Sequence, residues 1–331
     1  MPNTHKGLDR DELDSVVLAP GLGLPNDRRW ALRKGKSTGA SKFDPNAPAW
    51  LHKENFLCAF TANEQLGHYV TRFDDATERL TIKRRHSGAS GGNLNKRACR
   101  KGETEEVLLQ AQLTDATGRG KVEDFFAGVS GDQSVSLVSA KSGLNHHFGN
   151  TARGFRHHPS GSIIHIVNTA TVAALGAAAG ITLSATRFRP NFVVTGLPAW
   201  SEFDWVGRKI RLGDVNDGAI LEVISRTVRC DATKVDPVNG SGTEDFDVPE
   251  LLRKHFPEHG PYLGVYARVV SGGQVRPGDA VVELEQPLLE RCCARVTPES
   301  VRSILLTPRG CGITLVVTLL VLVAAVIFMG I

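Results

Sequence analysis

The sequence predicts an α+β fold that is predominantly β, followed by a transmembrane helix at its C-terminal end. Short runs that mix apolar and polar residues at strand length recur along the chain, bounded by Gly, Asp or Pro. Helical signals are few, and residues 312–331 hold no charged side chain. Many short strands separated by turn signals favour barrels or sandwiches over a doubly wound parallel sheet.

Strand-like runs and short helical segments alternate irregularly over the chain before residue 286. The expected strands are residues 15–18, 29–33, 79–83, 106–113, 134–138, 162–167, 192–195, 209–212, 219–225, 263–270 and 280–283. The expected helices are residues 62–70, 122–127, 169–179 and 248–256. The third helix is rich in alanine, and the fourth has Pro249 in its first turn, where a missing N–H is tolerated.

The C-terminal run GITLVVTLLVLVAAVIFMGI occupies residues 312–331. A helix rises about 1.5 Å per residue, so this length reaches across the roughly 30 Å of a bilayer's hydrocarbon core. A buried core helix would carry a polar stripe, which this run lacks. Arginine outnumbers acidic residues in residues 288–311, which favours the cytoplasmic side for that flank. The N-terminus is polar and shows no apolar run that could be a signal peptide. We therefore expect a single-pass membrane protein that is anchored at its C-terminus and has its soluble domains in the cytoplasm.

Composition excludes several classes of function. With 39 Lys+Arg against 35 Asp+Glu and only 6% aromatic residues, the chain lacks the basic, aromatic face that nucleic-acid binding needs. None of the six cysteines forms a C-x-x-C pair, which argues against zinc knuckles and a disulfide framework. Two pairs of adjacent histidines, at 146–147 and 157–158, have no carboxylate or cysteine at ligand spacing, so they predict no metal site.

Three clusters of residues depart from ordinary core patterning. They are Asp27-Arg28-Arg29-Trp30, Arg187-Phe188-Arg189-Pro190-Asn191 and Arg229-Cys230. Taken singly, they suit solvated or salt-bridged arginines and a small buried cysteine. Taken together, they suit the binding of a ligand. Arg binds phosphate through its planar set of N–H donors, and Asn can donate to and accept from the edge of a heterocycle. Positive charge beside a cysteine stabilises its thiolate, a soft ligand for a redox metal, so the set suits an anionic, phosphate-bearing metal cofactor.

Several motifs, in their order, resemble a MOSC domain. They are RFRPNFVV at residues 187–194, EFDW at 202–205, IRLGD at 210–214, VRC-x-x-T-x-VDP-x-x-G at 228–240, LGVY at 263–266 and Gly278-Asp279. Upstream, KGLDRDELDSVVLAPGLGLPNDRRWAL at residues 6–32 is similar to the N-terminal β-barrel domain that precedes MOSC in amidoxime-reducing-component-like proteins, and SIIHIVNTATVAAL at residues 162–175 resembles the strand and helix that join the two parts.

The resemblance covers residues 6–283 and implies two β-barrel-like domains with few short helices. Together with the C-terminal run, the expected organisation is a MOSC N-terminal β-barrel domain at residues 1–125, a MOSC domain at 126–286, a juxtamembrane linker at 287–311 and the transmembrane helix at 312–331.

The resemblance also implies roles for individual residues. In MOSC enzymes the cysteine of the R-C motif is the protein ligand of molybdenum in the pterin cofactor, molybdopterin, which implies a metal-binding and catalytic role for Cys230. The R-P-N motif implies that Arg189 and Asn191 hold the pterin and its phosphate. Further cofactor contacts are implied for Lys6, Arg28, Asn168, Thr169 and Arg229. Asp231, beside the metal ligand, is a candidate proton donor.

The expected function is that of a molybdenum-dependent oxidoreductase that reduces N-hydroxylated or other N-oxygenated compounds by two electrons. Because the sequence holds no haem or iron–sulfur motif, electrons are expected from a separate donor protein, a haem or iron–sulfur carrier with a reductase. One alternative is a sulfur-transfer or molybdenum-cofactor carrier module without its own turnover. Pyridoxal phosphate, which related sulfurases use, is not expected in this chain. Another alternative is a membrane-bound binding protein with a degenerate site.

Overall fold

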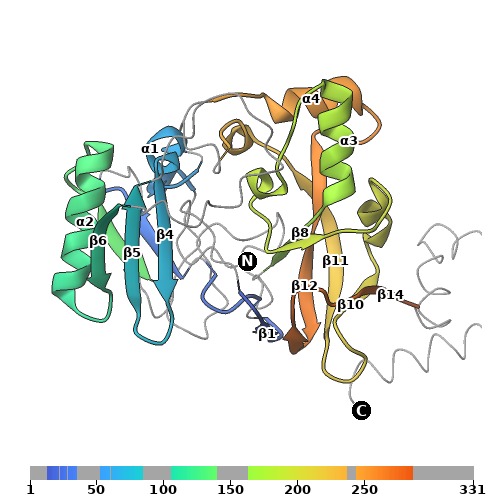
Figure 1. The fold of residues 1–331 in the computed structure, drawn as a ribbon, viewed down its shortest axis with the longest axis horizontal. Helices are drawn as coiled ribbons and strands as arrows, with labels where there is room; N and C mark the ends of the chain where they lie inside the picture. Colours follow the sequence, from blue (N-terminus) through green and yellow to red (C-terminus); the bar gives the residue numbers. More distant parts are fainter. Residues whose placement is uncertain are drawn as a thin grey trace, which may run out of the picture. The chain divides into compact units, whose positions relative to one another are not determined.

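The computed structural model describes residues 13–21, 23–27, 29–35, 53–59, 61–84, 106–139, 163–236 and 244–285. These residues are predominantly β, with four α-helices (Figure 1). The strands are β1 (Val16–Leu18), β2 (Trp30–Arg33), β3 (Phe56–Leu57), β4 (Tyr69–Asp74), β5 (Arg79–Arg84), β6 (Val107–Gln112), β7 (Ser136–Ser139), β8 (Ile164–Asn168), β9 (Phe192–Val194), β10 (Lys209–Leu212), β11 (Ala219–Val228), β12 (Tyr262–Ser271), β13 (Gly273–Val275) and β14 (Val281–Leu284). The helices are α1 (Asn63–Gly67), α2 (Ala116–Ser130), α3 (Thr169–Ala179) and α4 (Val248–His255).

Two three-stranded sheets in the first part of the chain share one core. Their strand orders are β3-β2-β7 and β4-β5-β6, and side chains from both sheets meet those of α2. Val122 and Phe126, one turn apart on α2, are completely buried in this core. The Asp115 side chain caps α2 by accepting from the Gly118 N–H at 2.6 Å. The predicted boundary between residues 125 and 126 falls inside α2, and β7 pairs with β2, so this core extends to the end of β7.

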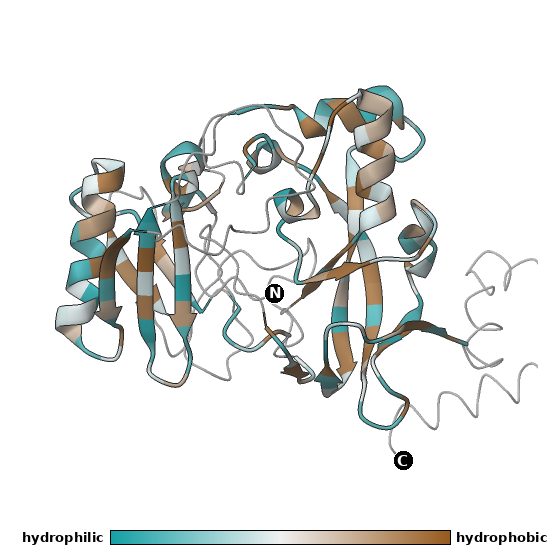
Figure 2. Ribbon diagram, in the orientation of Figure 1, coloured by the Kyte–Doolittle hydropathy of each residue, from teal (hydrophilic) through white to brown (hydrophobic). Residues whose placement is uncertain are grey.

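A six-stranded sheet forms the second part, in the order β14-β10-β11-β12-β8-β9. Its pairs are antiparallel except β8 with β9, which are parallel. Hydrophobic residues recur along its strands (Figure 2), and Ile210, Leu221, Val223 and Val265 are fully buried in its core. On β11, buried Leu221 and Val223 are spaced by two, which is the period of a strand with one buried face.

Helices α3 and α4 pack together over a smaller apolar cluster. Val172 and Leu175 of α3 meet Val248 and Leu252 of α4, and all four are buried. The Asn168 side chain caps α3 by accepting from Ala170 N–H at 3.0 Å, so β8 passes directly into α3. The end of β8 is thereby held at a defined place beside β12 and β9.

The earliest described strand belongs with the second part of the chain. β1 pairs antiparallel with β13, and Leu18 and Leu24 are buried in the same core as the six-stranded sheet. Residues close to the start of the chain are therefore part of the core that also contains β11 and β12.

The prediction of a predominantly β fold with few helices is confirmed, whereas closed barrels are not what the described strands form. Among these residues the six-stranded sheet is open, with β14 and β9 as its edges, and the first part holds two separate three-stranded sheets. A helix long and apolar enough to cross a membrane is not found within the described ranges. The predicted linker at residues 287–311 and the predicted span at 312–331 lie outside them.

Candidate functional site

Cys230 follows the end of β11 and presents an exposed thiol. Buried and exposed side chains alternate here: Thr227 and Arg229 are 1% and 8% exposed, whereas Val228 is 57% exposed and Cys230 is exposed and free of a disulfide. The Cys230 carbonyl accepts from the N–H and the hydroxyl of Thr233 at 3.0 and 2.9 Å, which begins the short helix η5 (Asp231–Thr233). The backbone at Cys230 is thus fixed while its sulfur faces outward.

The Arg229 side chain points the opposite way, into the protein. Its Nε donates to the Leu263 carbonyl at 2.8 Å, and its Nη2 donates to the same carbonyl. The Nη2 also lies 2.5 Å from His165 Nε2, and Nη1 donates to the Phe188 carbonyl at 3.3 Å. The guanidinium carbon is 5.2 Å from the Phe188 ring centre. One arginine therefore joins β12, β8 and the turn before β9.

Arg229 stays cationic at neutral pH although it is buried. Burial lowers the pKa of Arg229 to about 10, and interactions with Tyr266 and Cys230 oppose that shift. Its hydrogen-bond partners are carbonyl oxygens and an imidazole nitrogen, which carry no negative charge. A buried cation with neutral partners favours an anion close by. A thiolate at Cys230, or an anionic ligand beside it, would supply that charge.

Arg189 and Asn191 lie in the turn that leads into β9. Arg189 has φ 53° and ψ 51°, a left-handed conformation that costs a non-glycine residue about 1–3 kcal/mol. The surrounding structure must therefore hold this turn in place. Asn191 is completely buried and is bonded twice to the backbone of His165, since its Oδ1 accepts from His165 N–H at 2.9 Å and its N–H donates to His165 O at 2.8 Å.

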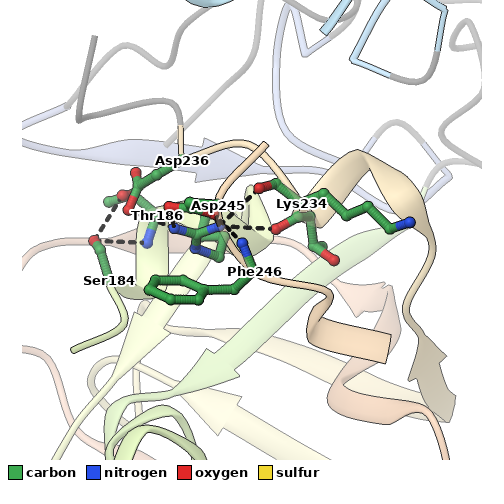
Figure 3. A network of polar contacts seen from close by, with 8 residues as sticks. Ser184, Thr186, Lys234, Asp236, Asp245 and Phe246 are labelled. Carbon is green, nitrogen blue, oxygen red and sulfur yellow. Dashed lines mark hydrogen bonds and ion pairs between the residues drawn. The ribbon is translucent and has the colours of Figure 1, made fainter. Parts of the chain in front are cut away.

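Arg187 clasps the chain that follows Cys230. Its side chain is 1% exposed, and its Nη1 and Nη2 donate to the two carboxylate oxygens of Asp245 at 2.6 and 2.5 Å. Figure 3 shows Asp245, Asp236 and Lys234 of this network. The Nη2 also donates to Asp236 at 3.2 Å, and Nη1 to the carbonyls of Thr233 and Lys234 at 3.0 and 3.3 Å. This bidentate, multiply bonded geometry is the strongest form of an arginine–carboxylate pair. The clasp fixes the loop whose first residue is Cys230.

Asp231, the candidate proton donor, belongs to the ion pairs of the same loop. Its carboxylate lies 3.2 Å from Lys234 Nζ, and Asp247 lies 3.1 Å from that nitrogen. Hydrogen bonds that the Lys234 ammonium donates to Asp247 and Asp231 raise the pKa of Lys234. The Asp231 side chain is 67% exposed, and its surroundings give no support to the proton-donor role.

The joint between β8 and α3 holds a second polar network. The Asn168 Nδ2 donates to Glu202 Oε2 at 3.1 Å, and the Thr171 hydroxyl donates to the same oxygen at 2.8 Å. Burial raises the pKa of Glu202. Since Asn168 is completely buried and its Oδ1 caps α3, its amide is engaged within the fold, whereas Thr169 is only partly buried at the helix start.

The structure therefore brings some of the sequence-predicted residues together and leaves others aside. Arg189, Asn191 and Arg229 meet around His165, and Cys230 adjoins Arg229. Lys6 and Arg28 lie outside the described residues, as do the two histidine pairs. Within those residues, the structure contains no group of three or more His, Cys, Asp or Glu side chains that could hold a metal ion.

Sequence reasoning gave no role to His165 and none to Arg187 beyond membership of a cluster. The signal for His165 was a polar residue within the apolar run IIHIV of a predicted strand. The signal for Arg187 was its place beside the R-P-N motif. Its main partner, Asp245, lies 58 residues away, and spacing alone does not identify such a partner.

Comparison with known proteins identifies the region that contains this site. The MOSC domain family model matches residues 143–282. This part of the chain is therefore similar to a MOSC domain. The chain is also similar to amidoxime reducing components over about two fifths of its length. The match to mitochondrial amidoxime reducing component 2 of Bos taurus is 27% identical over 137 residues, covering 39% of this chain and 39% of that protein.

Mitochondrial amidoxime-reducing component 1 of Homo sapiens is 30% identical over 129 residues, covering 37% of this chain and 36% of that protein. The chain thus spans about two fifths of the length of these relatives. Among solved structures, YiiM from Geobacillus stearothermophilus aligns with a TM-score of 0.29 and 18% identity, over 44% of this chain and 70% of that one. A similarity at that TM-score carries no argument about this fold.

Proposed function

We propose that this MOSC domain binds a molybdenum–pterin cofactor with Cys230 as the protein ligand of the metal. The observation that carries the proposal is that an exposed cysteine free of a disulfide directly follows Arg229, a buried cation whose hydrogen-bond partners are neutral. The donor set fits the cofactor chemically, because a thiolate is a soft ligand for a redox metal and arginine suits a phosphate.

The chain's own residues would bind and orient the group. Cys230 presents its sulfur from a backbone fixed by Thr233, and the Arg187 clasp keeps the following loop in place. Arg229 would contribute positive charge beside the metal ligand, while Arg189 and Asn191, in the turn before β9, would hold the pterin and its phosphate. When bound, the cofactor supplies two-electron redox chemistry that protein side chains lack, and the protein contributes positioning and electrostatics.

The activity we propose is two-electron reduction of N-oxygenated compounds, such as an amidoxime to its amidine with release of water. Two electrons and two protons balance that reaction. Support comes from the similarity of this chain to proteins named amidoxime reducing components. The electrons would come from a separate donor protein, a haem or iron–sulfur carrier with a reductase.

A second candidate function is that of a sulfur-transfer or cofactor-carrier module without turnover. The exposed Cys230 thiol is the observation that favours it, since a sulfur carrier also needs an accessible thiol. In this case the protein would present sulfur or cofactor to a partner and would reduce no amidoxime.

We also propose that residues 312–331 tether the protein to a membrane, with the MOSC domain on the cytoplasmic side. The support is the uncharged run of these residues and the excess of arginine in residues 288–311. A tether would raise the local concentration of a donor protein held on the same surface. A carbonate wash tests this: the full-length chain is expected in the membrane pellet, and its release into the supernatant would contradict the tether.

The proposed function is tested by purifying the full-length chain in detergent and measuring molybdenum, pterin and amidoxime reduction with reduced methyl viologen as electron donor. We expect molybdenum near one per chain, with reduction abolished in Cys230→Ala. Bound cofactor without reduction would favour the carrier function. Activity and metal content unchanged in Cys230→Ala would contradict the role of Cys230.

A further inference from the structure

We infer that His165 is the positioning residue of the candidate site, holding Arg229, Arg189 and Asn191 in one arrangement. This inference rests on the proposed cofactor-binding function and names a residue whose side chain does not itself need to touch the cofactor. His165 lies on β8, is 4% exposed, and contacts the three other residues through both its ring and its backbone.

The imidazole ring connects the two arginines. Its Nε2 lies 2.5 Å from Arg229 Nη2, and because a guanidinium can only donate, Nε2 must accept. The proton then sits on Nδ1, which lies 3.4 Å from the carbonyl oxygen of Arg189. The ring is thus assigned as the neutral Nδ1–H tautomer by its two neighbours.

The backbone of the same residue holds Asn191. The two hydrogen bonds between Asn191 and His165, at 2.9 and 2.8 Å, fix both the side-chain oxygen and the main chain of Asn191. The left-handed turn at Arg189 is therefore held from both sides, by the ring at the Arg189 carbonyl and by the backbone at Asn191.

Space for the ring depends on a glycine. Gly264 on β12 has φ +75°, and a Cβ there would lie 3.1 Å from His165 Nε2 and 2.5 Å from the Ile166 carbonyl oxygen. The ring also lies 5.3 Å from the Tyr266 ring, centre to centre. His165 is therefore enclosed by β12 on one side, and its ring has little freedom to leave Arg229.

A neutral acceptor at this place has a consequence that a carboxylate would not have. An Asp or Glu beside Arg229 would pair with the guanidinium and neutralise its charge. The imidazole fixes the guanidinium geometrically and leaves its charge in place. His165 therefore holds the position of Arg229 without neutralising its charge, in the way that residues next to a ligand shell orient metal ligands.

Three substitutions in the full-length chain separate the two ring contacts. In His165→Gln the amide oxygen can take the place of Nε2 and accept from Arg229. In His165→Asn the amide nitrogen can take the place of Nδ1 and donate to the Arg189 carbonyl, but Arg229 loses its acceptor. His165→Phe removes both contacts and keeps an aromatic ring of similar size.

Molybdenum and pterin retained after extensive dialysis form the first measurement, with the molybdenum(V) electron paramagnetic resonance spectrum as the second. We expect His165→Asn and His165→Phe to lose cofactor about tenfold to a hundredfold faster than wild type, and His165→Gln to restore retention to within about threefold. We also expect an altered spectrum for the His165→Asn and His165→Phe cofactor that remains. Equal retention and identical spectra in all four proteins would overturn the inference.

A cofactor-free measurement separates this inference from the proposed function. In the ¹⁵N-labelled protein without cofactor, the ring signals of His165, assigned by their loss in His165→Gln, should show the Nδ1–H tautomer at pH 7. An Nε2–H tautomer or a doubly protonated ring would overturn the role of His165 even if wild type holds molybdenum. A wild-type protein that holds no molybdenum but shows the Nδ1–H tautomer would overturn the proposed function and leave the positioning of Arg229 supported.

Discussion

Two buried arginines in this chain lie in opposite electrostatic surroundings. Arg187 is surrounded by the carboxylates of Asp236 and Asp245, whereas Arg229 donates to neutral carbonyls and to an imidazole. Both are less than a tenth exposed. The difference indicates two different roles. Arg187, which is neutralised by carboxylates, stabilises the local structure, whereas the charge of Arg229 is not balanced by its hydrogen-bond partners and can interact with a nearby anion.

The two arginines also lie on either side of the same short segment. Arg187 holds the loop after Cys230, and Arg229 lies directly before Cys230. Arg187 therefore holds the loop that follows Cys230, and Arg229 places a buried positive charge one residue before it. The proposed role of Cys230 as the molybdenum ligand depends on these two different roles of Arg187 and Arg229. Substitutions at each arginine test whether the roles differ.

Replacing Arg187 with Met should lower the free energy of unfolding by about 3–5 kcal/mol, because it removes a buried, multiply bonded guanidinium and leaves two partly buried carboxylates without this cation. Chemical denaturation measures the loss. Arg253→Met is the matched control, since Arg253 is 54% exposed and pairs with Glu250, so its removal should change stability by less than about 0.5 kcal/mol. Equal losses of unfolding free energy in the two variants would show that the buried Arg187 ion pairs stabilise the fold no more than an exposed ion pair does.

Replacing Arg229 with Met should cost less, about 1–3 kcal/mol, because the groups left behind are neutral acceptors. The same denaturation experiment measures it, and bound molybdenum is measured in parallel. We expect the molybdenum content of Arg229→Met to fall, although its stability falls less than that of Arg187→Met. A stability loss as large as that of Arg187→Met would mean that the charge of Arg229 is balanced within the fold.

Glu202 offers a third buried charge, of opposite sign, whose effect depends on pH. Burial raises its pKa above the usual 4.5, so the folded protein binds more protons than the unfolded chain between those two values. Stability should therefore fall as pH rises from about 4.5 through the raised pKa. Glu202→Gln should remove this part of the pH dependence, measured as unfolding free energy between pH 4 and pH 8. An unchanged slope in the variant would contradict the assigned burial cost.

Replacing Cys230 with Ser should have the smallest effect on folding, within about 0.5 kcal/mol, because its side chain is exposed and makes no disulfide. Thermal unfolding of the cofactor-free protein measures it. A large loss would mean that Cys230 is a structural residue rather than a presented ligand.

Much of the local structure could be predicted from the sequence because it depends on near neighbours. Residues 169–179 and 209–212 were predicted with the bounds that the structure has, since alanine content and strand patterning are local signals. β4 was missed because residues 62–70 were read as one helix, whereas α1 ends at Gly67 and the chain turns into a strand at Tyr69. β13 was missed because it is only three residues long.

The candidate site was predicted in part, for a similar reason. The R-P-N and R-C motifs marked Arg189, Asn191, Arg229 and Cys230, because residues adjacent in sequence stay adjacent in space. What joins them, His165, is 26 residues from Asn191 and 64 from Arg229, and only the order of β8, β9, β11 and β12 brings it to them. Strand order is a long-range property that periodicity along one strand does not contain.

The most direct test of the central claim is X-ray absorption at the molybdenum edge of the purified full-length protein and of Cys230→Ser. We predict that molybdenum has sulfur neighbours in the wild-type protein. In Cys230→Ser we predict either one fewer sulfur neighbour of molybdenum or no bound metal. The same metal content with the same number of sulfur neighbours in both proteins would contradict Cys230 as the ligand that Arg229 supports.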